Sequence, residues 1–426
     1  VNIDTSSRNK AAVSVTGEGD TNIKLDGDNA LKSDIYRSGI YGSGSGSLTI
    51  SGGENDSLTA QGGSGANGIS SSGSLTISGG TVTANGDDGG RGISSSGSVT
   101  ISGGSTVTAN GGNGTISGGD GICSNGGVTI SGGSTVTANG GNGGSLVGGD
   151  GIRSGGGLTV SDGTVTAKGG NGDSKDGYGG DGIRSGGVIT ISGNTVNAAG
   201  GYGGKVGGYG ICSFDRVAIS GGTVEAAGGN GSTGGGSGIY SSVIDLSGSL
   251  ELTAKAGSPN GKALLQAGHE LDLDTIKDKL GPGAKVTVTD ADGKVNQVSI
   301  PRPVEPEEPV IPEESSSSSD GGSATPSTPA SPLPGLTVTD KSGAVISYTS
   351  TQSGNTLTVC VGRFTASFRI SLAALRQLRA EGIETITFQT ILCSTTLSVD
   401  ELLAMGGEDA EAVLTHRLTD SSLTVG

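Results

Sequence analysis

The dipeptide Gly-Ile recurs eight times in the first 240 residues, and this repeat restricts the fold more than any other feature. Successive copies are 24 to 31 residues apart. In most units the dipeptide is followed by a segment such as "LTIS", a glycine pair, a segment such as "TVTA" and a glycine-rich loop. Self-similarity at such a period predicts a repeat architecture with one structural unit per copy. The repeated glycines are Gly39, Gly68, Gly92, Gly121, Gly151, Gly182, Gly210 and Gly238.

Apolar and polar residues alternate within each unit. Leu75 and Ile77 share one face of "LTIS", and Val82 and Ala84 share one face of "TVTA". This period of two, with β-branched residues between glycine turns, predicts short strands. Identical strands at one fixed period are expected to stack on their own copies rather than form a hairpin array. The sequence therefore predicts an all-β protein, a right-handed, single-stranded parallel β-helix of about eight to ten coils.

The composition of the chain changes after residue 300. We expect residues 1–300 to form the β-helix, with residues 1–38 as an atypical first coil or cap and "KVTVTDADGKVNQVSI" as a closing hairpin. Residues 301–334 hold 9 of the 11 prolines and a serine run, which is typical of a solvated linker. Residues 335–426 combine strand patterns with the helix pattern "SLAALRQLRAEG" and the capping box Ser398–Glu401, which predicts a small α+β domain.

Charge and hydropathy exclude two kinds of partner. The net charge is −16, and no cluster of Lys and Arg is present for contacts with nucleic-acid phosphates. No apolar run approaches the roughly 20 residues that span a bilayer, so membrane insertion is not expected. The chain starts at Val1 without a charged and then apolar leader, and we interpret it as a mature or trimmed segment of an extracellular or cell-surface protein.

The four cysteines are too few for a disulfide scaffold. Cys123 and Cys212 hold the same position in units three coils apart, which a β-helix would separate by about 14 Å. A disulfide requires α-carbons within about 7 Å, so this pair is expected to stay reduced. Cys360 and Cys393 lie in two expected strands of the tail, and a disulfide between them stays open.

Three consecutive units place an aspartate directly before Gly-Ile. These residues are Asp120, Asp150 and Asp181. Stacking would bring their carboxylates to about 5 Å, and the repulsion of about 1 kcal/mol per pair in water must be offset. Two interpretations stay open: each aspartate hydrogen-bonds its own turn, or Ca²⁺ bridges oxygens from adjacent coils.

Two arginines and three tyrosines are the candidate ligand-binding residues. Arg153 and Arg184 follow two of the aspartates by three residues, and they either form surface ion pairs or hold a ligand carboxylate. Tyr178, Tyr202 and Tyr209 fall in loops of successive units. Their rings either stack on sugars or fill local gaps.

Signals for catalysis are weak. Asp87 and Asp88 beside Arg91 are similar to the paired acids of an inverting glycosidase, but they equally fit an ordinary acidic turn. The two histidines, His269 and His416, fall in the expected cap and tail, which disfavours a nucleophilic triad. The outward threonines of the "TVTA" segments would form flat ladders that resemble those of ice-binding β-helices, or they simply suit exposed strand positions.

The recurrent pattern "GI.S.G.LTISGGTVTA.GG.G", with "GGDG" before several of the isoleucines, resembles the bacterial carbohydrate-binding-domain family of right-handed parallel β-helices with a pectate-lyase-like fold. The resemblance covers about residues 38–258. It implies binding of cellulose or acidic polysaccharide at the cell surface, with acidic corner residues as Ca²⁺ ligands. That role would pass to Asp120, Asp150 and Asp181.

The expected function is that of a secreted or cell-surface polysaccharide-binding protein, non-catalytic and assisted by calcium. One alternative is a polysaccharide lyase or glycoside hydrolase on the same fold, although the chain has few of the basic residues that a lyase site needs. Another alternative is an adhesin or structural spacer.

Overall fold

The computed structural model divides the chain into two compact units, Val1–Glu308 and Pro309–Gly426. The expected linker at 301–334 lies outside the described residues, apart from Pro301. The structure describes residues 1–301, 335–340, 345–346, 348–353, 355–361, 363, 365–390, 394–407, 410–416 and 421–425.

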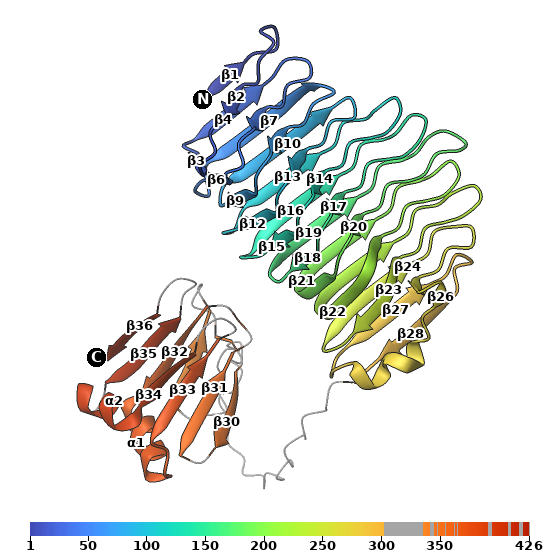
Figure 1. Ribbon diagram of the computed structural model, residues 1–426. Helices are drawn as coiled ribbons and strands as arrows, with labels where there is room; N and C mark the ends of the chain where they lie inside the picture. Colours follow the sequence, from blue (N-terminus) through green and yellow to red (C-terminus); the bar gives the residue numbers. More distant parts are fainter. Residues whose placement is uncertain are drawn as a thin grey trace, which may run out of the picture. The chain divides into compact units, whose positions relative to one another are not determined.

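The first unit is a right-handed parallel β-solenoid of about twelve turns (Figure 1). The first of its three strand ladders contains the Gly-Ile segments, whose isoleucines are fully buried and stack on one another. It consists of β2 (Val13–Val15), β5 (Ile40–Gly42), β8 (Ile69–Ser71), β11 (Ile93–Ser95), β14 (Ile122–Ser124), β17 (Ile152–Ser154), β20 (Ile183–Ser185), the start of β22 (Ile211–Ala227), β23 (Ile239–Leu246) and β25 (Leu264–Gln266).

The "LTIS" segments form the second ladder, with equivalent positions of the repeat in register. Its strands are β3 (Thr21–Lys24), β6 (Leu48–Ser51), β9 (Leu75–Ser78), β12 (Val99–Ser102), β15 (Val128–Ile130), β18 (Leu158–Val160) and the first part of β21 (Ile189–Ala199), followed by parts of β22 and β23.

The "TVTA" segments form the third ladder. Val82 pairs with Val107 and Ala84 with Ala109, and all four side chains are buried. The expected inward rungs and outward threonine columns are therefore confirmed. The strands are β1 (Asn2–Asp4), β4 (Asp28–Lys32), β7 (Ser57–Ser64), β10 (Thr81–Asp87), β13 (Thr106–Asn110), β16 (Ser134–Asn139), β19 (Gly163–Lys168), parts of β21 and β22, β24 (Leu250–Lys255) and β27 (Lys285–Thr289).

The glycine-rich loops between the third and first ladders stack in register along one side of the solenoid (Figure 1). We call this layer the glycine wing; it comprises residues 111–120, 140–150, 169–181, 200–209 and 228–237. Each loop of the wing has a segment that leaves the third ladder and a segment that returns to the first ladder. These two kinds of segment alternate in one chain of backbone hydrogen bonds: Gly149 donates to Gly141, and Gly170 donates to Gly149, both at 2.8 Å. A Cβ on Gly149 would lie 1.9 Å from the Gly119 carbonyl oxygen. The wing therefore requires glycine because backbones touch there.

The turn count exceeds the expected eight to ten because the chain ends join the solenoid. Residues 1–38 contain the first coil of the solenoid, one of the two expected alternatives, and not a separate cap: β1, β2 and β3 pair in parallel with β4, β5 and β6. At the other end the expected hairpin is confirmed, with β27 antiparallel to β28 (Val295–Ser299). β26 (His269–Glu270) and the 3₁₀-helix Leu273–Lys279 also lie at this end. Such elements cover a strand edge that would otherwise be open.

The second unit contains two four-stranded sheets. One is antiparallel and the other is mixed. Helix α1 (Leu372–Ala380) and helix α2 (Val399–Met405) confirm the two expected helices, and the Ser398 side chain caps α2. One sheet is β29 (Leu336–Thr339), β32 (Ala366–Ser371), β35 (Glu411–His416) and β36 (Ser421–Val425); the other is β30 (Thr349–Ser353), β31 (Thr356–Cys360), β33 (Thr385–Gln389) and β34 (Ser394–Ser398). Among the described residues, no helix is long and apolar enough to cross a bilayer.

Candidate functional site

Two adjacent columns of side chains run along the first ladder, one before each Gly-Ile and one after it. The column before the dipeptide reads Asn67, Arg91, Asp120, Asp150, Asp181 and Tyr209. The column after it reads Tyr41, Ser70, Ser94, Cys123, Arg153, Arg184, Cys212 and Tyr240. Charged residues gather in the middle turns, and we call Arg91, Asp120, Asp150, Asp181, Arg153 and Arg184 the charged strip.

The three aspartates stack as expected, but their hydrogen bonds differ from the own-turn interpretation. Each Oδ1 accepts a backbone N–H from the equivalent residue one turn further along. Asp150 donates to Asp120 at 2.9 Å, Asp181 donates to Asp150 at 2.8 Å, and Tyr209 donates to Asp181 at 2.7 Å. The aspartates are only 5 to 6% exposed. The row therefore connects four successive turns.

Asparagine performs the same task elsewhere in the solenoid. Asn67, in the same column, accepts the N–H of Arg91 at 2.9 Å. On the glycine wing, Asn142 accepts the N–H of Asn171, which in turn accepts that of Tyr202. An amide oxygen is sufficient for this bond, so the negative charge of the aspartates is an additional property of the strip.

Burial changes the ionisation of this row. Removal from water, followed by the neighbouring carboxyl groups, raises the pKa of Asp150 to about 8. Burial also raises the pKa of Asp181 to about 6, against the opposing effects of the Tyr209 N–H and Arg184. Because these two carboxyl groups interact, Asp150 and Asp181 titrate as a pair. The pair therefore retains a proton at neutral pH.

Two arginines compensate the outer aspartates. Arg91 Nε lies 3.3 Å from Asp120 Oδ2, and Arg184 Nη1 lies 3.7 Å from Asp181 Oδ2. Arg184 also lies over the Phe214 ring, 5.2 Å from its centroid. Arg153 is exposed and has no ion-pair partner within 4 Å in the described part of the chain. Its guanidinium is the cation of the strip that is available to a ligand.

The predicted tyrosines occupy two separate places. Tyr209 continues the aspartate column, and its ring stacks on Tyr240 with centroids 5.0 Å apart and planes 14° apart. Tyr178 and Tyr202 are on the glycine wing and are 43% and 47% exposed. Lys205 Nζ lies 5.7 Å from the centroid of the Tyr178 ring. Only Tyr209 therefore joins Arg153 and Arg184 along the first ladder.

Cys123 and Cys212 flank the two arginines in the second column. Both are free and buried, and three register steps separate them, in agreement with the expected absence of a disulfide between them. Burial raises the pKa of Cys123 to about 11 and that of Cys212 to about 12, so both thiols are protonated at neutral pH. Cys393 lies outside the described residues, so its disulfide with Cys360 stays a prediction.

The aspartate row does not fit a calcium site in this arrangement. Ca²⁺ takes about six to eight oxygen ligands, whereas each Oδ1 of the row already accepts an N–H. The second oxygens of Asp120 and Asp181 face arginines. Within the described residues, no group of three or more His, Cys, Asp or Glu side chains is placed to hold a metal ion.

The weak catalytic candidates belong to different elements of the fold. Asp87 Oδ1 accepts the N–H of Asp88, and Asp88 Oδ2 accepts the Ser64 hydroxyl, as in an acidic turn. His269 is in the short strand β26. His416 is buried in the second unit, with its ring edge on Phe368.

Comparison with protein-family models, curated proteins and solved structures finds no match in any of the three. The parallel β-solenoid is established by the strand pairings, and the carbohydrate-binding family stays a prediction. Arg91, Phe214 and Tyr240 were missed as partners of the strip. The positions of Arg91 and Tyr240 relative to Gly-Ile are the signal that would have found them, since they share the columns of the aspartates and arginines.

Proposed function

We propose that this solenoid is a secreted or cell-surface protein that binds polysaccharide without cleaving it, through the charged strip and the Tyr209–Tyr240 stack. The observation that carries the proposal is the exposed guanidinium of Arg153, which stacks in register on Arg184 and has no ion pair among the described residues. A planar guanidinium suits a sugar carboxylate. Successive turns rise by about 4.8 Å, which provides an extended row of contacts for a linear polymer.

Binding is favoured over cleavage by the state of the aspartates. An acid that acts on a glycosidic bond must reach the leaving oxygen or a water molecule. Here the carboxyl groups are almost fully buried, and Oδ1 of Asp120 and of Asp150 each accepts a backbone N–H. The raised pKa of Asp150 is the one observation that favours the alternative of a lyase or hydrolase, because acids with raised pKa values cluster at catalytic sites.

Substitution of Arg153 tests the proposal. Arg153→Ala is expected to weaken binding of the full chain to immobilised polygalacturonate by about tenfold or more, the range for loss of a charged hydrogen bond. Arg153→Lys should retain part of the affinity. Lys168→Ala is the matched control, because it removes an exposed cation from the third ladder. Equal affinity of wild type and Arg153→Ala would contradict the assignment.

Calcium assistance is a separate proposal from the resemblance, and it requires the aspartate hydrogen bonds to rearrange. Metal analysis of the purified chain tests it directly. Approximately one bound Ca²⁺ per chain, lost in Asp150→Asn, would support it. A content far below one ion per chain after dialysis against calcium would reject it.

A further inference from the structure

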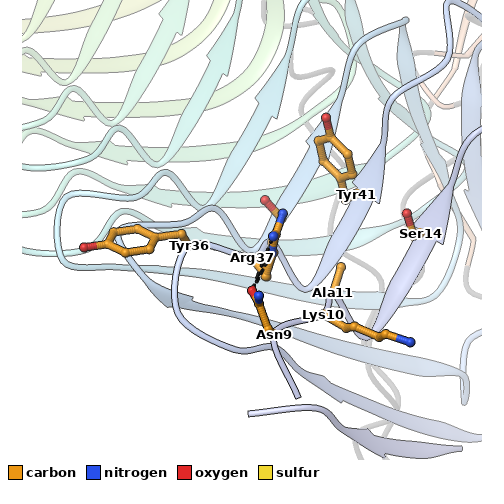
Figure 2. A pocket seen from close by; sticks show the side chains of 8 residues that line it. Asn9, Lys10, Ala11, Ser14, Tyr36, Arg37 and Tyr41 are labelled. Atoms are coloured by element: carbon orange, nitrogen blue, oxygen red, sulfur yellow. Dashed lines mark hydrogen bonds between the residues drawn. The ribbon is translucent and has the colours of Figure 1, made fainter. Parts of the chain in front are cut away.

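A pocket of about 550 Å³ lies at the N-terminal end of the solenoid, in turns before the charged strip (Figure 2). Its wall is formed by the loop after β1, by β2 and by the segment that leads into β5. Ser14 of β2 and Tyr41 of β5 are directly paired in the ladder. The polar and aromatic lining residues include Asn9, Lys10, Ser14, Tyr36, Arg37 and Tyr41.

Two exposed tyrosine rings border this pocket. Tyr41 is 42% exposed and belongs to the column after Gly-Ile. Tyr36 is 78% exposed, and its backbone has φ +59°, a conformation that is costly for a bulky residue. A Cβ on Gly65 would lie 3.0 Å from the Tyr36 ring, so the ring rests against the glycine of the next turn. The backbone of this turn thus presents a large apolar ring to solvent.

Arg37 lies between the two tyrosines, and a dashed contact to Asn9 is drawn in Figure 2. Its Nε and Nη2 donate to Asn9 Oδ1 at 3.4 and 3.3 Å. The described residues provide no ion pair to Arg37, and no acidic side chain lines the pocket. Asp34, in the same turn, instead accepts the N–H groups of Asn9 and Ile35.

The charge of the pocket is opposite to that of the chain. Lys10 and Arg37 supply two cations to the lining, whereas the whole chain has a net charge of −16. A guanidinium fork binds a carboxylate or sulfate through two parallel hydrogen bonds. The rings of Tyr36 and Tyr41 offer apolar faces with polar tips beside this fork. A ligand that matches the lining is therefore anionic on one side and presents C–H groups on another.

We propose that this pocket binds an anionic sugar residue, either a uronate or a sugar sulfate, as a second site for the polysaccharide. The polysaccharide as the ligand rests on the proposed function. The binding of an anionic sugar residue is inferred from the residues that line the pocket. Four register steps join Tyr41 to Arg153, through Ser70, Ser94 and Cys123. At about 4.8 Å per step the two sites are about 19 Å apart along the same column.

Calorimetric titration of the full chain with a short galacturonate oligomer tests the pocket. Arg37→Ala is expected to weaken binding by about tenfold or more, as for loss of a charged hydrogen bond. Tyr36→Gly removes the ring and suits the positive φ, so a loss of about threefold to tenfold without loss of thermal stability is expected. Lys24→Ala, which removes an exposed cation from nearby β3, should leave affinity unchanged.

The ligand series identifies the anionic group. The methyl ester of the same oligomer keeps the sugar shape and removes the charge, so it should not bind. A sulfated glucan oligomer that binds in place of the galacturonate would support the pocket and assign it to sugar sulfates. Equal binding of acid and methyl ester would overturn the proposal, as would unchanged affinity of Arg37→Ala for both anionic oligomers.

The two arginine variants distinguish this proposal from the function proposed above. If Arg37→Ala weakens binding and Arg153→Ala does not, the pocket stands and the charged strip is wrong as the contact surface. If only Arg153→Ala weakens binding, the pocket is overturned and the strip stands. Unchanged binding in both variants would overturn both.

Discussion

The Asp150 side chain has two opposed effects on stability, one from its hydrogen bond and one from its buried charge. Its Oδ1 accepts the Asp181 N–H at 2.8 Å and joins two turns, while its charge is buried between two other carboxyl groups. Because the folded pKa is about 8 and the ordinary value is 3.8, the folded chain keeps a proton that the unfolded chain loses. This contribution to stability is complete below about pH 4 and is lost as the pH rises to about 8.

Replacement of the acid by its amide separates these properties. Asp150→Asn retains the acceptor oxygen, as Asn67 does in the same column, and removes the buried charge. The free energy of unfolding is expected to rise by about 1 to 3 kcal/mol at pH 9, with little change at pH 4.5. Urea unfolding at the two pH values measures this difference. A variant less stable than wild type at pH 9 would show that the charge stabilises the row.

The pH dependence of the wild type follows from the same row. The melting temperature should fall between about pH 5 and pH 9, because Asp150 and Asp181, whose pKa values are both raised, must ionise inside the fold. The fall should be smaller in Asp150→Asn. Thermal unfolding followed by circular dichroism records both curves, and two parallel curves would contradict this origin of the pH dependence.

At the scale of elements, the glycine wing depends on backbone contact. Gly149→Ala places a methyl group 1.9 Å from the Gly119 carbonyl oxygen and is expected to lower the free energy of unfolding by about 2 kcal/mol or more. Gly17→Ala is the control, because no atom lies within 4 Å of its added methyl group. Chemical unfolding midpoints compare the two variants. Equal midpoints would show that the wing does not contribute to stability.

The strand ladders were predictable from the sequence because alternation places the same residue types on the same face in each unit. Val82 and Val107, for example, stack because one sequence repeat corresponds to one turn of the solenoid. The wing was not predictable, since glycine has no side chain whose pattern reveals a partner. The hydrogen bond between Asp150 and the next turn was also not predicted, because its partner is a backbone N–H that only the strand register identifies.

At the scale of the whole solenoid, the repeat locates the candidate sites along one column. The pairing of Arg153 with Arg184 follows from their shared position in the repeat. The pocket around Arg37 was not predicted, because residues 1–38 lack the Gly-Ile pattern and were expected to form an atypical first coil or a cap. Parallel pairing of β2 with β5 brings Ser14 beside Tyr41 and extends the column to the N-terminal turns.

Two sites on one column predict a dependence on polymer length. A chain that spans the roughly 19 Å between Tyr41 and Arg153 should bind at least about tenfold more tightly than a short oligomer, because the second contact becomes intramolecular. Arg37→Ala and Arg153→Ala should each remove this gain. Titration with a size series of galacturonate oligomers measures the dependence, and a constant affinity across the series would contradict the two-site arrangement.

The most direct test of polysaccharide binding without cleavage is to incubate the full chain with fluorescent polygalacturonate and measure, in one sample, the retained polymer and its length. Wild type is expected to retain the polymer at unchanged length, and Arg153→Ala is expected to retain much less. Shortened chains carrying unsaturated or new reducing ends would identify an enzyme. No retention of this polymer, of sulfated glucan or of cellulose would contradict the proposed function.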